Sequence, residues 1–379
     1  MNAPALSVSA LAKRFGGARQ WLGLRHAPVV RAVDGVTFDL AAGETLALVG
    51  ESGCGKSTTA RLVLRLMDPT AGSVTVHGED ITGLSDQHLL PLRKRMQIVF
   101  QDPYGSLNPR MLVRDILAES LLRHRIVSRR ELDTEVRRLL DLVGLSAFHA
   151  ERYPHEFSGG QRQRICIARA LAPRPELIVC DEAVSALDVS VQAQIINLLQ
   201  DLQEEFGLSY LFIAHDLALV RHIANRVAVM YLGEIVELGR NEDIFARPSH
   251  PYTQALLRAV PLPDPTAKKD RFRLSGEIPS PIDPPSGCRF HPRCAFASDI
   301  CRRETPVRQT IAEGHEVACH HWREARQYEE TSPWLKAVSE PSRQLTSLAA
   351  YFAGRESPAA KAPRAHERDF NGAGGAGDV

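Results

Sequence analysis

The sequence lacks any long hydrophobic run. Its apolar stretches are short and interrupted, such as Leu46–Val49, and none reaches the roughly 18 consecutive apolar residues that a membrane helix needs. The N-terminus has no basic start followed by an unbroken apolar segment, so no secretory signal is expected. We therefore expect the chain to stay in the cytoplasm and to work at a membrane only through a partner.

An excess of one charge is also missing. Lys and Arg number 46 and Asp and Glu 45, which leaves a net charge of +1. This balance gives no support for a strongly charged partner such as bulk DNA or an anionic bilayer. Hydrophobic residues make up 44% and charged residues 24%, which excludes a largely disordered or collagen-like chain. A length of 379 residues predicts two or three domains.

Cysteine is scarce and unevenly placed. Four of the seven cysteines fall close together, at Cys288, Cys294, Cys301 and Cys319. In a reducing compartment such a group is more typical of a metal site than of a disulfide framework. The spacing C-x₅-C-x₆-C-x₁₇-C is neither that of zinc fingers nor that of the common ferredoxins. Four thiolates can hold a [4Fe–4S] cluster. Zinc is an alternative, because a histidine could replace a thiolate; the candidates are His291, His320 and His321. Thiols without a metal are the third alternative.

Alternation of strands and helices indicates an α/β fold. Buried or alternating apolar runs predict strands at 33–40, 45–49, 72–78, 177–180, 210–214 and 226–231. Helical patterns are found at 58–66, 114–123, 130–143, 161–172 and 191–206. The sheet should therefore be largely parallel, with right-handed crossovers. From about residue 245, prolines exclude a long helix or a central strand, and the last 20 residues are predicted to be disordered.

The strongest functional signal is a glycine-rich loop between the strand 45–49 and the following helix. Gly50-Glu51-Ser52-Gly53-Cys54-Gly55-Lys56-Ser57 matches G-x-x-x-x-G-K-[ST], and Thr58 follows it. Glycines let successive N–H groups point into one concavity, and the helix N-terminus adds its positive end. The lysine of such a loop reaches the β- and γ-phosphates, and the serine hydroxyl can coordinate Mg²⁺. The loop therefore predicts a site for a nucleoside triphosphate.

Two acids follow another buried strand. Asp181 and Glu182 come directly after Leu177–Cys180. An acid at the end of a strand beside a phosphate loop can hold Mg²⁺, and we assign this role to Asp181. Glu182 is then placed to polarise the attacking water.

A second glycine-rich segment begins the helix at 161–172. Phe157-Ser158-Gly159-Gly160-Gln161 combines a serine hydroxyl, two glycines and a helix N-terminus, which is the form of an anion cradle. The nucleotide site described above has no use for it. The alternative is an ordinary Ser/Gly helix cap.

In order and spacing, these motifs resemble the ATP-binding cassette (ABC) ATPases, from about residue 6 to residue 322. The matching motifs are Gly50–Ser57 (Walker A), Gln101 (Q-loop), Phe157–Gln161 (signature), Leu177–Glu182 (Walker B), Ser185–Asp188 (D-loop) and His215 (switch histidine). The signature begins with Phe where Leu is commoner, a mild departure that leaves Ser158 and Gly160 in place.

The resemblance implies a P-loop fold with a RecA-like core, an antiparallel β subdomain and a helical subdomain. It also implies head-to-tail pairing, in which Walker A of one domain and Ser158–Gln161 of the other enclose each ATP. Gln101 is expected to touch Mg²⁺. His215 is expected to contact the γ-phosphate as a catalytic residue; a satisfied buried histidine is the alternative. Phe15 is the candidate for stacking on adenine, and a core or exposed phenylalanine is the alternative.

Further segments resemble the ATPases of oligopeptide and dipeptide importers. They are Gln101–Arg110, Ser249–Leu257 with its His-Pro-Tyr, and the cysteines ending at Cys319. Relatives of this class imply a [4Fe–4S] cluster on the four cysteines, with zinc as the alternative. The expected domains are an ATPase at 1–245 with a helical subdomain at about 86–170, a C-terminal domain at 246–322, and a partly disordered tail at 323–379.

The importer resemblance also implies a function and partners. The expected function is ATP-driven import of peptides at the cytoplasmic face of the inner membrane, without nucleic acid. The partners are a second ATPase subunit (a paralogue or a second copy), two membrane permease subunits and an extracytoplasmic peptide-binding protein. Nickel, glutathione, sugars or cell-wall peptides are alternative cargoes. A soluble ABC ATPase of DNA repair or ribosomes is the rival, disfavoured by a single Walker A and the lack of a heptad run.

Overall fold

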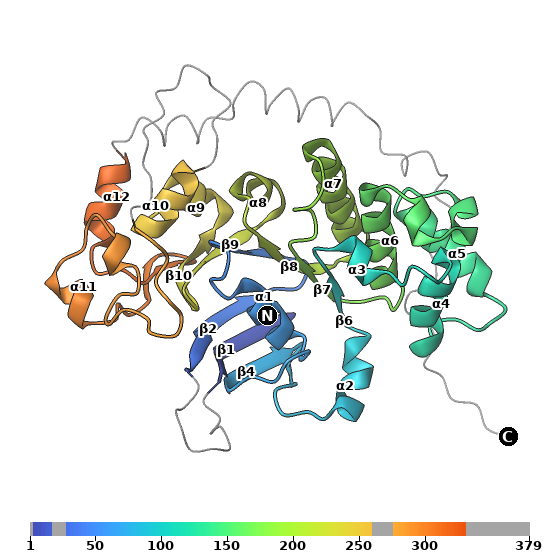
Figure 1. Cartoon of the computed structure of the whole chain (residues 1–379), viewed down its shortest axis with the longest axis horizontal. Helices are drawn as coiled ribbons and strands as arrows, with labels where there is room; N and C mark the ends of the chain where they lie inside the picture. Colours follow the sequence, from blue (N-terminus) through green and yellow to red (C-terminus); the bar gives the residue numbers. More distant parts are fainter. Residues whose placement is uncertain (1–2, 17–27, 260–275, 331–379) are drawn as a thin grey trace. The chain divides into compact units, whose positions relative to one another are not determined.

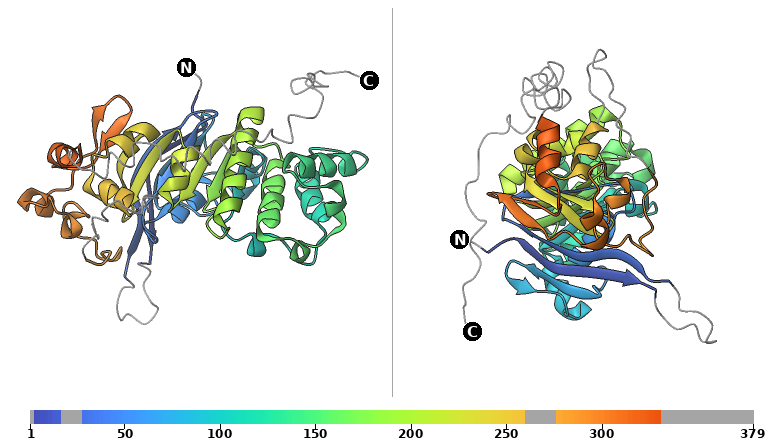
Figure 2. Two further views of the ribbon diagram at one scale, coloured as in Figure 1. Left: turned by 90° about the horizontal axis from the view of Figure 1, so that it is seen from above. Right: turned by 90° about the vertical axis from the view of Figure 1, so that its left-hand side faces the viewer.

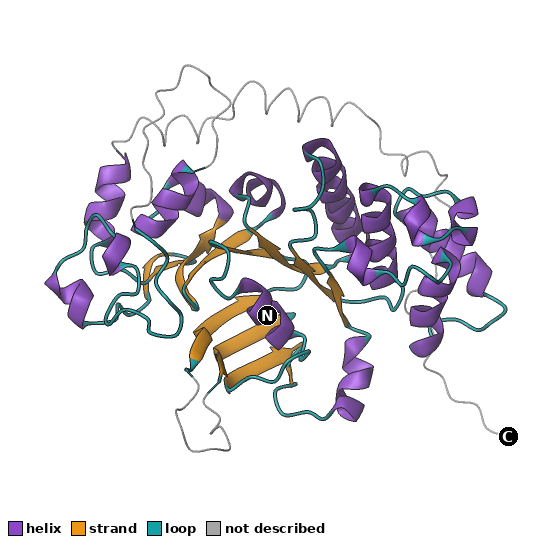
Figure 3. Ribbon diagram, in the orientation of Figure 1, coloured by secondary structure: helices purple, strands orange, loops and turns teal. Residues whose placement is uncertain are grey.

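The computed structural model describes residues 3–16, 28–259 and 276–330. In these ranges the chain forms two β-sheets with helices packed around them (Figures 1 and 3). The predicted α/β class is confirmed. The insertion at 17–27 and the tail from 331, including its predicted disorder, lie outside the described residues.

The larger sheet has the strand order β11-β12-β10-β9-β3-β8-β7-β6. The run from β9 to β6 is parallel, as predicted, whereas β10, β12 and β11 continue it in antiparallel fashion. Its strands are β3 (Thr45–Val49), β6 (Met96–Val99), β7 (Leu177–Asp181), β8 (Ser209–Ala214), β9 (Arg226–Tyr231), β10 (Glu234–Arg240), β11 (Gln309–Ala312) and β12 (His315–Val317).

The smaller sheet is antiparallel and has the order β2-β1-β4-β5. Its strands are β1 (Leu6–Phe15), β2 (Val30–Leu40), β4 (Ala71–Val76) and β5 (Glu79–Asp80). Successive residues of a strand face opposite sides, so Leu46 and Leu48 of β3 join the core shared with this sheet and helix α1 (Lys56–Val63). Ala47 and Val49 join the core on the other face.

The helices beyond β6 form the part that the sequence predicted as a helical subdomain. They are α3 (Pro103–Ser106), α4 (Val113–Arg123), α5 (Leu132–Leu142), η1 (Ala147–Glu151), η2 (Pro154–Glu156) and α6 (Gly159–Leu171). Figure 2 shows them beyond the β6 edge of the larger sheet. The predicted range of about 86–170 also includes α2 (Asp86–Arg93) and β6, and β6 belongs to the larger sheet. The mostly helical part therefore begins at α3.

The other edge of the larger sheet carries the C-terminal extension, defined here as residues 246–259 and 276–330. Its helices are α10 (Pro251–Arg258), η3 (His291–Arg293), α11 (Asp299–Arg303) and α12 (Trp322–Glu330); α7 (Val189–Phe206), α8 (Leu217–Ile223) and α9 (Asn241–Ala246) precede it. Helix α12 falls where the tail was predicted to begin. It packs on α10, since Gln254 Nε2 donates to the carbonyl of the fully buried Ala325 at 2.9 Å.

Candidate nucleotide site

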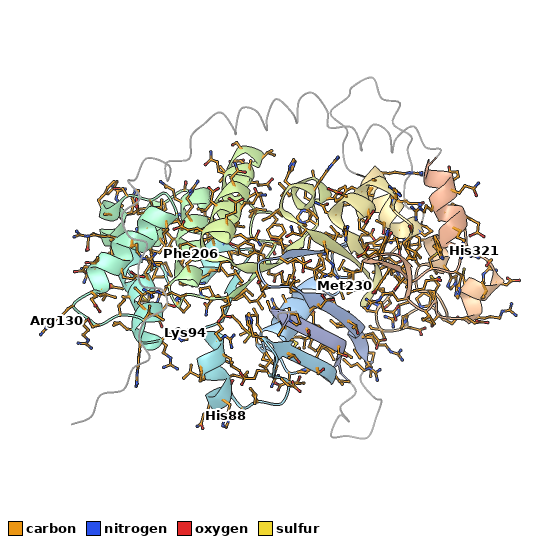
Figure 4. All side chains as sticks on the ribbon, turned by 180° about the vertical axis from the view of Figure 1, so that it is seen from behind. His88, Lys94, Arg130, Phe206, Met230 and His321 are labelled. Atoms are coloured by element: carbon orange, nitrogen blue, oxygen red, sulfur yellow. The ribbon has the colours of Figure 1, made fainter. Side chains whose placement is uncertain are left out.

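The loop from Gly50 to Ser57, here called the phosphate loop, leaves β3 and turns into α1. Gly50 has φ +155° and Gly55 has φ +110°. A Cβ at Gly50 would come 2.2 Å from the carbonyl oxygen of Met230, and one at Gly55 would come 2.2 Å from that of Ala32. Met230, labelled in Figure 4, lies on β9. The loop can therefore pass this close to β9 and β2 only with glycine at these two positions.

The backbone of the phosphate loop presents free donors. Within the described residues, the N–H groups of Gly53, Gly55, Lys56 and Ser57 donate to no protein acceptor. The helix begins at Lys56, two residues before the prediction, so all four donors precede or open its first turn. Unpaired N–H groups at a helix N-terminus favour an anion.

Lys56 is buried in the same loop. Its Nζ donates to the carbonyl oxygens of Gly50 at 2.8 Å and Glu51 at 3.0 Å. Burial raises the pKa of the neighbouring Cys54 thiol, so this cysteine stays protonated at neutral pH. Ser52 is exposed and Thr58 half-buried. The loop thus holds one cation beside its free N–H groups.

Ser57 and Asp181 meet at the end of β7, as the sequence predicted for two ligands of one ion. The Ser57 hydroxyl donates to Asp181 Oδ1 at 2.8 Å. Burial raises the pKa of Asp181 and the adjacent Glu182 adds to this, whereas the hydrogen bond from Ser57 lowers it. β3 and β7 flank β8 in parallel, so their carboxyl ends lie at one edge of the sheet.

Glu182 brings the remaining predicted polar residues together. Its Oε2 accepts a hydrogen bond from Gln101 Nε2 at 2.9 Å and lies 3.7 Å from His215 Nδ1. Glu182 has φ +50°, which is strained for a residue with a side chain. Its N–H donates to Ile213 O at 3.0 Å, which fixes this backbone. His215 is exposed, so the buried alternative is excluded.

The signature segment lies apart from these groups. Gln161 N–H donates to Ser158 Oγ at 3.3 Å, and Ser158 N–H donates to Gln161 Oε1 at 3.1 Å, which is a capping box at the start of α6. Gly159 and Gly160 are half-buried, and a Cβ at Gly160 would come 2.5 Å from Val191. In the part of the chain that the structure describes, no hydrogen bond or ion pair joins Ser158–Gln161 to the phosphate loop. The helix cap is formed, and a role as anion cradle stays a prediction.

Phe15 ends β1 and is 38% exposed. Lys13 Nζ lies 5.3 Å from the centre of its ring. Stacking of this ring on adenine stays a prediction.

Sequence reasoning missed two residues that contact the phosphate loop from the C-terminal extension. They are Tyr252 and Arg293, and both reach Glu51. The His-Pro-Tyr segment pointed to the extension only through its resemblance to importers. No local pattern marked these two residues, because other polar side chains stand beside both of them in the sequence, such as His291 and Gln254.

The four clustered cysteines are free thiols. Burial raises the pKa of Cys288 and Cys294 to about 11. It also raises the pKa of Cys319, to which the other three cysteines add, so all four side chains lie within electrostatic range of one another. Backbone groups of Phe290 and His291 offset part of the rise in the pKa of Cys288, and those of Phe296 and His321 do the same for Cys294 and Cys319. The His291 N–H itself donates to the Cys288 carbonyl oxygen at 3.0 Å.

The predicted metal site is not formed as a tight set of ligands. Among the described residues, no three His, Cys, Asp or Glu side chains converge closely enough to hold a metal ion. The three histidines that could replace a thiolate have other partners. His291 pairs with the Cys288 carbonyl at 2.9 Å, His320 with the Glu304 carbonyl at 2.9 Å and His321 with the Ser298 hydroxyl at 2.6 Å.

Comparison with known proteins places these features in a family. Residues 33–185 match the ABC transporter family, and residues 236–301 match the C-terminal region of oligopeptide/dipeptide transporters. A probable peptide ABC transporter ATP-binding protein of Sinorhizobium fredii is 55% identical over 320 residues, 84% of this chain and 90% of its own length. The oligopeptide transport ATP-binding protein AppF of Bacillus subtilis is 53% identical over 311 residues, 81% of this chain and 94% of its own.

Solved structures agree on the fold. The ATP-binding cassette MJ0796, solved as a dimer in a post-hydrolysis state with ADP and Pi, is 27% identical with a TM-score of 0.55. The match covers 62% of this chain and 98% of the cassette. Across the described residues, no helix is both long and apolar enough to span a bilayer. The chain belongs to the ATP-binding, ATP-hydrolysing subunits of ABC transporters, in the oligopeptide/dipeptide class.

Proposed function

We propose that this subunit hydrolyses ATP to power the import of dipeptides and oligopeptides. The observation that carries the ATPase chemistry is the meeting of Ser57 with Asp181, and of Glu182 with Gln101 and His215, beside one phosphate loop. The match of residues 236–301 to the oligopeptide/dipeptide transporter C-terminal region supports the cargo class. The names of the relatives from Sinorhizobium and Bacillus support it as well.

The phosphate loop has the donors that a triphosphate needs. Lys56 and the free N–H groups of Gly53, Gly55 and Ser57 would bind the β- and γ-phosphates. Ser57 and Asp181 offer hard oxygen ligands that fit Mg²⁺, which would neutralise charge on the phosphates. Mg²⁺ is usually held by one or two carboxylates plus substrate phosphates, so it needs no cage of three protein carboxylates.

Glu182 is the proposed general base. Its carboxylate would accept a proton from the water that attacks the γ-phosphorus, while the bond from that phosphorus to the bridging oxygen breaks and ADP leaves. Gln101 holds Glu182 by a hydrogen bond and joins this group to the helices that begin at α3. His215, 3.7 Å from Glu182, is proposed to contact the γ-phosphate.

A complete site needs a second subunit in this proposal. Ser158–Gln161 starts α6 with an exposed serine and touches no residue of the phosphate loop among the described residues. Pairing would bring this segment of one subunit over the ATP of another. The dimeric cassette with ADP and Pi supports this arrangement by analogy. The partner is a paralogue or a second copy.

The remaining partners follow from the transporter class. Two membrane permease subunits would bind near residues 101–115, and an extracytoplasmic binding protein would deliver the peptide. The subunit would then be peripheral, at the cytoplasmic face of the inner membrane.

Peptide uptake in cells tests this function. We expect loss of labelled oligopeptide uptake when the gene is deleted, restoration by the wild-type chain and no restoration by Glu182→Gln. Co-purification of the tagged chain with two permease subunits is the matching biochemical test. Normal peptide uptake in the deletion strain, with loss of nickel or glutathione uptake instead, would reassign the cargo and leave the ATPase standing.

We also propose that Cys288, Cys294, Cys301 and Cys319 hold one [4Fe–4S] cluster. Four thiols within electrostatic range of one another fit such a cluster. Zinc on the same four thiolates is the alternative. When bound, the cluster would cross-link an extension that has little regular structure.

Iron analysis tests the cluster. Anaerobically purified protein should be brown and contain about four irons per chain. Cys301→Ser should remove the iron and speed hydrogen exchange across residues 285–322, with turnover at saturating MgATP unchanged. Cys166→Ala, at a buried cysteine outside the extension, is the control and should keep the iron. Stoichiometric zinc without iron, or no metal, would overturn the cluster and leave the ATPase untouched.

A further inference from the structure

Two side chains of the C-terminal extension hold one residue of the phosphate loop. The backbone N–H of Glu51 donates to the Tyr252 hydroxyl at 2.8 Å. The Arg293 guanidinium donates to both carboxylate oxygens of Glu51, at 2.7 and 3.0 Å. The loop motif leaves the second position open to any residue, so these contacts are not a requirement of the motif itself.

The contact is buried on the extension side. The Arg293 side chain is 4% exposed and that of Glu51 is 23% exposed. Tyr252 is fully buried, with its ring centre 4.6 Å from that of Tyr231 and 5.4 Å from that of Phe290. A two-point, charge-assisted bond in such surroundings is strong and directional. If one partner is removed, the other charge is left uncompensated.

The backbone that carries Tyr252 is held in place through β10. The carboxylate of Glu237, which is fully buried, accepts the N–H groups of Ser249 at 2.7 Å and His250 at 3.0 Å. His250 Nδ1 then accepts the N–H of Tyr252 at 3.0 Å. Burial lowers the pKa of His250 to about 4, so its ring is neutral and can accept. The His-Pro-Tyr segment is thereby fixed to the larger sheet.

Glu51 matters for the phosphates in two ways. Its carbonyl oxygen accepts a hydrogen bond from Lys56 Nζ at 3.0 Å, so the position of Glu51 affects where the lysine charge lies. Its carboxylate is a negative charge one residue beyond Gly50, in a loop with the free donors of an anion site. Without a counter-charge, it would repel bound phosphates.

We propose that Arg293 and Tyr252 are positioning residues for MgATP binding: they hold Glu51 out of the phosphate cradle and neutralise its charge. This inference rests on the proposed function, in which the phosphate loop binds ATP. The loop is then ordered before the nucleotide arrives, so less affinity is lost to ordering it. The C-terminal extension, through these two residues, sets the affinity of the site without touching the nucleotide.

The proposal predicts an effect on affinity rather than on turnover. Bound phosphates would order the loop even without the contacts that Arg293 and Tyr252 make with Glu51. The kcat at saturating MgATP should therefore stay within about twofold of wild type. Arg293→Met should weaken MgATP binding by about 10-fold, the size of a typical coupling between sites. Tyr252→Phe removes only the hydroxyl and orphans the Glu51 N–H, which should weaken binding by about fivefold.

A second substitution separates charge from structure. In Arg293→Met, the repelling carboxylate of Glu51 remains. Adding Glu51→Gln removes that charge, so the double variant should regain affinity to within about threefold of wild type. A residue that only supports the fold would not be rescued in this way.

The control is another arginine that ties the extension to the ATPase core. Arg308 donates to the Thr37 carbonyl on β2 at 2.8 Å and pairs with Glu316 at 2.8 Å, away from the phosphate loop. Arg308→Gln should leave MgATP affinity unchanged.

The experiment measures MgATP dissociation constants of the full-length chain by calorimetry, and kcat and KM of the assembled transporter. Higher dissociation constants and KM for Arg293→Met and Tyr252→Phe, with rescue by Glu51→Gln, support the proposal. Wild-type affinity in both single variants, no rescue, or an equal loss in Arg308→Gln would overturn it. Failure of the wild-type chain to bind MgATP, or unchanged binding in Lys56→Ala, would instead overturn the proposed function.

Discussion

Helices α1 and α6 both begin beside glycines, but the N–H groups at their N-termini have different partners. At the phosphate loop, the N–H groups of Gly53, Gly55, Lys56 and Ser57 have no acceptor in the described protein, and a buried lysine stands beside them. At the signature, Ser158 and Gln161 satisfy each other's N–H groups in a capping box.

The difference indicates how much each element needs another molecule. The unpaired donors and two close-packed glycines at left-handed φ that make the phosphate loop a candidate anion site all come from one chain. The signature is a stable helix start that leaves its serine exposed. Binding should therefore depend on the first and pairing of subunits on the second.

Glu182→Gln should have the largest effect and keeps the shape of the side chain. We expect steady-state ATP turnover in the assembled complex to fall by about 10²–10⁴-fold, because the proposed general base is lost. MgATP binding, measured by calorimetry, should survive. Near-normal turnover would remove Glu182 from the catalytic role and leave the loop as a binding element only.

Lys56→Ala should affect binding most. In the proposed function the buried ammonium meets the phosphates as a point charge, so its loss should weaken MgATP affinity by about 100-fold and abolish peptide uptake. Calorimetry on the full-length chain measures this. An unchanged affinity, with uptake intact, would contradict the assignment of the loop.

Ser158→Arg tests the other half of the comparison. A bulky cation at the exposed signature should block ATP-driven pairing of subunits. The measurement is size-exclusion chromatography of Ser158→Arg made in the Glu182→Gln chain, where the dimer should be lost. Affinity of the single subunit for MgATP should remain within about twofold of the parent, because no signature residue contacts the loop. Loss of binding to the single subunit would place the signature in its own site.

Ser158→Ala should have the smallest effect. It removes the side-chain acceptor for the Gln161 N–H and should lower the free energy of unfolding by about 1 kcal/mol. Ser158→Asn, which keeps a capping oxygen, is the matched control for stability measured by urea denaturation. If Ser158→Ala is as stable as wild type, the capping box contributes nothing and the signature is less preformed than the structure indicates.

The sequence by itself was enough to predict the strands and motif residues that depend only on neighbouring positions. The bounds of β3 and β9 were predicted as they are found, and the roles of Lys56, Ser57 and Asp181 were assigned from motifs. These features are local, since a glycine loop between a strand and a helix needs only its own residues and their neighbours. The place of β6 was not predicted, because β6 joins the larger sheet through pairing with β7, which no local pattern reveals.

Only the tertiary structure decided which distant residues act on the loop. Gln101 and Glu182 were predicted separately, and their direct hydrogen bond depends on β6 lying beside β7. Glu51 was predicted as a loop residue, but its partner Arg293 stands 242 positions away. Such a pair forms because packing of the extension against the larger sheet buries the arginine next to a carboxylate, and packing between distant segments leaves no periodic signal in the sequence.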